Sequence, residues 1–137
     1  MRYSADHKAH THQRIIKDAS VRFRRDGIGA TGLQPLMKAL NLTHGGFYNH
    51  FASKEALIAE AAAQGFVETA ERYAGYSVRD VIDAYISRAH RDARGQGCSA
   101  AALSGEAARL PNDTRAVFGA GIAGLACARR LVQAGAA

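Results

Sequence analysis

The sequence predicts an all-α fold, and three observations support this prediction. Apolar residues recur at spacings of three and four along most of the chain, which is the period of an amphipathic helix. Glycine, serine or threonine stands at the boundaries of these stretches, where such residues cap helices. No run of residues alternates apolar and polar side chains as a half-buried strand does. We therefore expect helices joined by short turns.

The first predicted helix covers about residues 10–25 and carries a basic outer face. Its apolar positions are Ile15, Ile16, Ala19 and Phe23. Asp26-Gly27 ends the helix, because glycine takes the left-handed conformation that closes helices. The H-x-x-H-x-H run at residues 7–12 is compatible with metal capture, but we favour a mobile arm that trails along a partner.

A second helix and a short third one follow a glycine-containing connection. The apolar positions of the second helix are Leu33, Leu36, Met37 and Leu40. Thr31 is a candidate cap, and Pro35 falls in the first turn, where a missing N–H does no harm. Residues 41–43 form a tight turn, and Thr43 is a candidate cap for a short helix over residues 44–50.

The segment NLTHGGFYNHFASKEAL, residues 41–57, has almost no aliphatic side chains before Leu57. Phe47 and Phe51 stand four residues apart and therefore point to one side, where they anchor the short helix on the core. The opposite side is small or polar. Two short helices joined by about three residues on a basic domain are the pattern of a helix-turn-helix, whose second helix enters the DNA major groove.

Further helices are predicted toward the C-terminus. Ser53 caps a helix that runs to about Tyr73 and is broken at Gly75-Tyr76-Ser77. The later helical stretches are residues 78–86, 100–110 and 114–132, and residues 91–97 are predicted as a loop. We divide the chain into a helix-turn-helix DNA-binding domain at residues 1–54 and a partial helical regulatory domain at residues 55–137.

The net charge of +6 lies entirely in the first part of the chain. Residues 1–54 hold nine Lys and Arg against three Asp and Glu, whereas residues 55–137 hold nine of each. This asymmetry indicates that the N-terminal domain faces a polyanion. The chain has no long apolar run, no apolar middle of a signal peptide and no disulfide framework, so we expect a cytoplasmic protein.

Residues 37–57, MKALNLTHGGFYNHFASKEAL, resemble the N-terminal signature of the TetR-type transcriptional repressors. The shared features are a small-residue reading helix, a Tyr-x-His-Phe element at residues 48–51 and a Ser-Lys-Glu-Ala-Leu helix start at residues 53–57. The similarity extends upstream to RIIKDASVRFRRDGIGATGL and covers roughly residues 12–66. It implies a homodimer that binds palindromic operator DNA and is released by a small-molecule effector. The acids are scattered and no serine has a plausible histidine and acid arrangement, so we expect neither catalysis nor a cofactor.

The resemblance also implies a role for individual residues. Some positions match those that read bases, others match those that grip the phosphate backbone, and Thr31 matches a cap placed against a phosphate. Glycine at 45 and 46 additionally lets the backbone approach DNA closely. The implied DNA-binding residues are Thr31, Thr43, His44, Gly45, Gly46, Tyr48, Asn49, His50 and Lys54.

The C-terminal part carries a weaker resemblance. Residues 90–110 are similar to a segment of some of these repressors in which a Gly-Cys pair opens a helix of the ligand pocket. Cys98 is then either a thiol sensor at a helix N-terminus or a small pocket-wall or core cysteine, and we favour the second reading. Tyr73, Tyr76 and Tyr85 are candidate pocket residues by their type alone.

Two alternative functions follow from the C-terminal end. Gly119-x-Gly121-x-x-Gly124 resembles the start of an FAD or NAD motif and suggests an oxidoreductase fragment, although that motif needs flanking strands. A glycine-rich helix packed closely on its neighbours is the simpler interpretation. TetR-type proteins also usually carry two further helices that form the dimer interface. We expect this chain to be shortened there, which leaves open a helical protein that has lost operator binding.

Overall fold

The computed structural model describes residues 4–134, with side chains described up to residue 124, and this range is all-α as predicted. The α-helices are α1 (Ala5–Asp26), α2 (Leu33–Ala39), α3 (Lys54–Arg72), α4 (Val78–Tyr85), α5 (Arg88–Asp92), α6 (Ser99–Ala107) and α7 (Asn112–Ala134). Two 3-10 helices, η1 (Gly45–Asn49) and η2 (Arg94–Gln96), complete the described part. Within this part, no helix combines the length and apolar composition needed to cross a membrane.

Helix α1 is longer than predicted, because it begins at Ala5 instead of about residue 10. The hydroxyl oxygen of Ser4 accepts the N–H of His7 at 3.2 Å and so caps the first turn. The prediction of a mobile arm at residues 7–12 is therefore wrong, since these residues are helical. At the other end Gly27 has a φ of 93° and donates its N–H to the Phe23 oxygen at 2.8 Å, which confirms the glycine exit.

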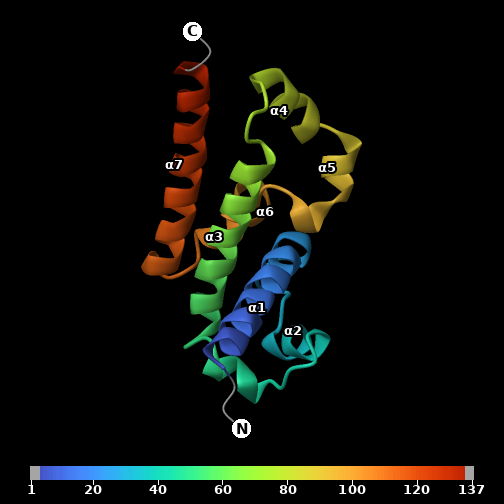
Figure 1. The fold of residues 1–137 in the computed structure, drawn as a ribbon, viewed down its shortest axis with the longest axis vertical. Coiled ribbons are helices and arrows are strands. Elements are labelled where there is room, and N and C mark those ends of the chain that lie inside the picture. Colours follow the sequence, from blue (N-terminus) through green and yellow to red (C-terminus); the bar gives the residue numbers. More distant parts are fainter. Residues whose placement is uncertain (1–3, 135–137) are drawn as a thin grey trace.

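The apolar face of α1 forms the centre of the N-terminal core. Ile15 and Phe23 are buried there together with Leu36 of α2, Phe47 of η1 and Leu57 of α3. Figure 1 shows these elements gathered at the end of the molecule where the chain begins. The close packing of one cluster therefore fixes the two short helices relative to α1 and α3.

The core continues along α3 into the C-terminal helices, and α7 lies beside α3 (Figure 1). Phe66 of α3 packs edge-to-face on Phe118 of α7 with ring centroids 6.0 Å apart. Leu103 of α6 is buried in the same cluster. Helix α3 thus contributes to both ends of the core, and the expected domain boundary between residues 54 and 55 falls in its first turn.

The glycine-rich run at residues 119–124 lies inside α7, which is continuous from Asn112 to Ala134. Residues 116–118, which a dinucleotide motif requires as a strand, are helical. Gly121 faces Phe66 so closely that a Cβ there would lie 2.3 Å from the ring Cδ2. The described residues therefore do not form the strand arrangement of an oxidoreductase fragment, and the close-packed helix is confirmed.

Helices α4 and α5 project from one side of the molecule (Figure 1). Ser77 and Asp80 make a reciprocal capping box at the start of α4, and the apolar face of this helix is largely exposed, with Ile86 at 74%. The predicted loop at residues 91–97 is wrong in part, because α5 reaches Asp92 and η2 follows it. The Ser87 hydroxyl caps α5 by accepting the N–H of His90 at 3.1 Å.

Candidate nucleic-acid interface

Two aromatic side chains hold η1 on the body of the protein. Phe47 and Phe51 are buried, as predicted, and their rings stack with centroids 5.3 Å apart. The element is a 3-10 helix of five residues instead of the predicted α-helix over residues 44–50. Its tighter winding and two glycines make it weak in isolation, so its shape depends on this aromatic anchor.

The turn between α2 and η1 depends on Asn41, which has a φ of 57°. The N–H of Leu42 reaches back to the Met37 oxygen at 2.9 Å, as in the capping motif that closes many helices. Asparagine tolerates this left-handed conformation better than other side-chain-bearing residues. The predicted tight turn at residues 41–43 is therefore confirmed, and Asn41 explains why α2 ends there.

The predicted cap at Thr43 is also present. Its Oγ1 accepts the N–H of Gly46 at 3.1 Å, at the first turn of η1. Gly45 is exposed, and a Cβ built on it meets no atom within 4 Å. The backbone of η1 is thus bare on this side, which is the geometry that a close approach to a groove requires.

The polar residues of η1 form the exposed face opposite the aromatic anchor. Tyr48 is 59% exposed, and its ring is held edge-on by Phe47 at a centroid separation of 5.2 Å. His44 and Asn49 are exposed beside it, and the His44 ring lies 6.2 Å from that of Tyr48. The predicted DNA-binding residues Thr43, His44, Gly45, Tyr48 and Asn49 are therefore all exposed at η1.

Thr31 does not play the predicted capping role. Its side chain is buried, and its hydroxyl donates to the Gly27 oxygen at 2.8 Å. Gly32 occupies the cap position of α2, so no side chain caps the first turn of this helix. Thr31 therefore closes the turn after α1 instead of facing a phosphate.

Lys54 is half-buried, and its ammonium donates to the Ile28 oxygen at 3.0 Å. This contact ties the first residue of α3 to the turn between α1 and α2. An ammonium has three protons, so the remaining two stay available for a phosphate. Lys54 consequently has a positioning role inside the protein that its place in the sequence does not reveal.

His50 follows η1 and is also half-buried. Burial lowers its pKa, and the nearby positive charges of His12, Lys8 and His7 lower it further. Its Nδ1 is buried and has no hydrogen-bond partner among the described residues. His50 is therefore a neutral imidazole near pH 7, so it brings hydrogen-bonding capacity but no charge to a phosphate.

The candidate pocket residues lie near α4 and α5, away from η1. They are Tyr73, Tyr76, Tyr85 and Cys98. A hollow of about 240 Å³ is lined by Tyr73 and by Arg72, Tyr76, Ala84, Ser87, Ala89, His90, Ala93 and Gln96. Tyr85 and Cys98 do not line it, but they are neighbours. Burial raises the pKa of the Tyr85 phenol, and the neighbouring Cys98 thiol raises that pKa further.

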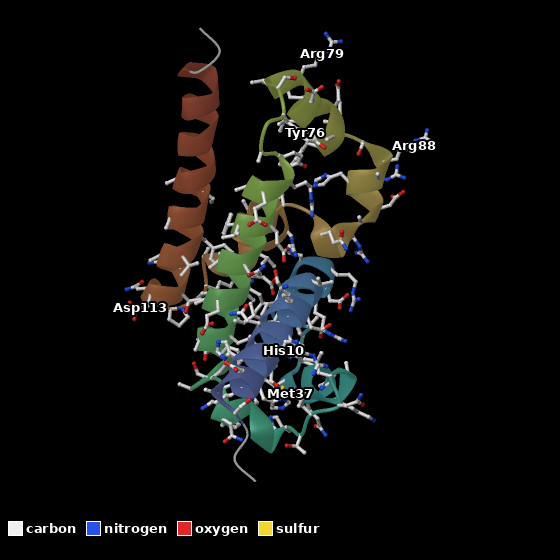
Figure 2. The ribbon with its side chains drawn as sticks, in the orientation of Figure 1. His10, Met37, Tyr76, Arg79, Arg88 and Asp113 are labelled. Carbon is white, nitrogen blue, oxygen red and sulfur yellow. The ribbon has the colours of Figure 1, made fainter. Side chains whose placement is uncertain are left out.

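Figure 2 shows that the two regions are well separated, with His10 of α1 and Met37 of α2 near one end and Tyr76 near the other. At the first end, a short helix with a polar outer face follows α2 after a tight turn, on a domain that carries the net positive charge. This arrangement defines a helix-turn-helix DNA-binding domain.

Residues 15–61 match the family model of the bacterial regulatory proteins of the tetR family. Residues 15–61 are thus identified as a TetR-type N-terminal helix-turn-helix domain, and residues 62–137 lie outside the match. A comparison of the sequence with curated proteins gives no match.

Proposed function

We propose that this chain is a TetR-type transcriptional repressor that binds palindromic operator DNA as a homodimer and is released by a small-molecule effector. The observation that carries the proposal is the exposed polar face of η1, fixed from behind by the buried Phe47 and Phe51. A helix that contacts base edges needs polar groups on its solvent-facing side. Its other side must be packed rigidly on the protein core, because base contacts depend on accurate placement.

In this proposal the residues of the η1 face divide into two groups. Thr43, His44 and Asn49 reach base edges, and the bare backbone at Gly45 allows close contact with the groove. Gly46 is half-buried, and its N–H is bound by the Thr43 hydroxyl. Tyr48, Lys54 and the neutral His50 contact phosphate oxygens, which sets register and affinity instead of sequence choice. Lys54 makes such a contact with the protons that Ile28 does not occupy.

The effector is proposed to act through the helical part after residue 54. The hollow beside Tyr73 offers phenol, imidazole and guanidinium groups around a small apolar floor. Tyr85 lies beside it, because its ring centroid is 4.5 Å from that of His90, which lines the hollow, and Cys98 is a neighbour of Tyr85. A ligand that enters the hollow displaces α4 and α5, which contribute no buried residue to the core and therefore move at low cost. No catalytic role is proposed for the chain, and its expected location is the cytoplasm.

The proposal is tested by selecting duplexes that the purified full chain retains from a random pool. Tyr48→Ala should weaken binding to the enriched duplex about tenfold, because it removes a fixed contact to the DNA backbone. Tyr76→Ala is the matched control, since Tyr76 is also exposed, at 44%, but lies at the other end of the molecule. Failure of the wild-type chain to enrich any duplex would refute the proposal, and equal binding by both variants would refute the role of Tyr48.

A further inference from the structure

The turn between α1 and α2, residues 27–32, is held by a carboxylate from a distant part of the chain. Glu106 of α6 accepts the N–H of Ile28 at 2.9 Å through Oε2 and the N–H of Gly29 at 2.8 Å through Oε1. Both oxygens of one carboxylate thus bind two successive backbone amides. Hydrogen bonds to an ionised acceptor are stronger than neutral ones, so this clamp is a substantial restraint.

Two glycines of the turn make room for the carboxylate. A Cβ at Gly27 would lie 3.2 Å from Glu106 Oε2, and a Cβ at Gly29 would lie 3.4 Å from Oε1. Gly27 also has the positive φ that turns the amides toward α6. The glycine exit of α1 therefore serves the clamp as well as the end of the helix.

The same turn is also held by contacts within the DNA-binding domain. The Ile28 oxygen accepts the ammonium of Lys54, and the Ile28 side chain is buried in the cluster that contains Phe47. Ile28 is thus held through its N–H by Glu106, through its oxygen by Lys54 and through its side chain by the core. A shift of this residue is transmitted directly to the anchor of η1 and to the start of α3.

The other end of α6 is also tied to α1. Arg24 is buried, and its Nη1 donates to the oxygen of Gly97, two residues before α6, at 3.1 Å. Its Nη2 donates to Glu68 Oε2 at 2.9 Å and its Nε to the Ser20 oxygen at 3.1 Å. Helix α6 is therefore fastened to α1 near its beginning and to the turn after α1 near its end.

We propose that Glu106 is a positioning residue for DNA binding. Its carboxylate fixes the turn at residues 27–32 and thereby the placement of α2 and η1. A residue of α6, outside the helix-turn-helix, therefore determines whether η1 is positioned to bind DNA. This inference rests on the proposed function, because it requires that η1 contact DNA.

The test compares Glu106→Gln with Glu71→Gln in the full chain. Glu71 is exposed on α3, so the control removes the same negative charge without the clamp, and any general gain in DNA attraction is shared by both variants. In Glu106→Gln, the amide hydrogens of Ile28 and Gly29 should exchange faster by NMR. Affinity for the duplex that the wild type enriches most should fall about tenfold relative to Glu71→Gln.

Glu106→Asp provides a second variant that retains the charge but is one methylene shorter, and it should give an intermediate loss of affinity. If Glu106→Gln does not fold, this variant decides the question against the wild type. Equal affinity of Glu106→Gln and Glu71→Gln, or of Glu106→Asp and the wild type, would overturn the inference while leaving the proposed function intact. A wild type that enriches no duplex overturns the proposed function, and this inference with it.

Discussion

His12 of α1 stacks on Phe51, with ring centroids 4.3 Å apart and planes inclined by 19°, while its Nε2 lies 2.8 Å from Glu60 Oε2. One imidazole therefore joins α1, the segment after η1, and α3. Since Phe51 also stacks on Phe47, His12 covers the aromatic anchor of the reading helix. The H-x-x-H-x-H pattern of the sequence did not indicate this packing role.

Replacement of His12 by alanine should lower the free energy of unfolding by about 1 kcal/mol, because it removes an aromatic contact and a partly exposed hydrogen bond. Urea denaturation of the two proteins measures the difference. His10→Ala is the control on the same helix, where the side chain is exposed, and should change stability by less than about 0.5 kcal/mol. A His10→Ala variant as unstable as His12→Ala would contradict the packing role.

The lowered pKa of His50 predicts that stability depends on pH. The unfolded chain takes up the proton near the ordinary value of 6.5, whereas the folded chain resists it because of burial and the charges of His12, Lys8 and His7. This contribution is therefore fully present above pH 6.5 and is lost as the pH falls through the lower folded value. Thermal unfolding between about pH 5 and pH 8 should show it.

His50→Gln removes the titrating group and should flatten that profile on the acidic side. The comparison is needed because the chain holds five histidines besides His50. Parallel pH profiles for the wild type and His50→Gln would show that His50 is not the group responsible.

Two glycines of α7 should respond in opposite directions to the same substitution. In Gly121→Ala the new methyl group would lie 2.3 Å from Phe66 Cδ2, so the variant should lose about 1–3 kcal/mol of stability. At Gly119 nothing lies within 4 Å, so alanine should stabilise the helix by up to about 1 kcal/mol. Chemical denaturation distinguishes the two, and destabilisation of similar size at both sites would contradict the packing of α7 on α3.

The elements of this fold follow largely from local signals. Gly27 ends α1, Ser53 caps α3 by accepting the N–H of Ala56, and Phe47 and Phe51 anchor η1, all as the spacing indicated. The start of α1 was missed because polar residues with no apolar periodicity follow Ser4, so only the cap marks it. Such features act over a few residues and are therefore visible in the sequence.

The long-range contacts were not visible. Glu106 binds the amide of Ile28 across 78 positions of the chain, and the buried Arg24 donates to Glu68 of α3, to Gly97 just before α6 and to Ser20 of its own helix. Neither residue has a local pattern that distinguishes it from a solvated charge. For the same reason the prediction of Thr31 as a helix cap is wrong, because its hydroxyl donates to the Gly27 oxygen. The sequence also does not indicate that the Lys54 ammonium donates to the Ile28 oxygen.

NMR titration of the full chain with its selected duplex shows whether η1 enters a DNA groove. We expect the amide signals of residues 43–50 to shift or broaden most, with much smaller changes at residues 78–92 of α4 and α5. Largest changes at α4 and α5, with the signals of η1 unmoved in a chain that binds the duplex, would contradict it.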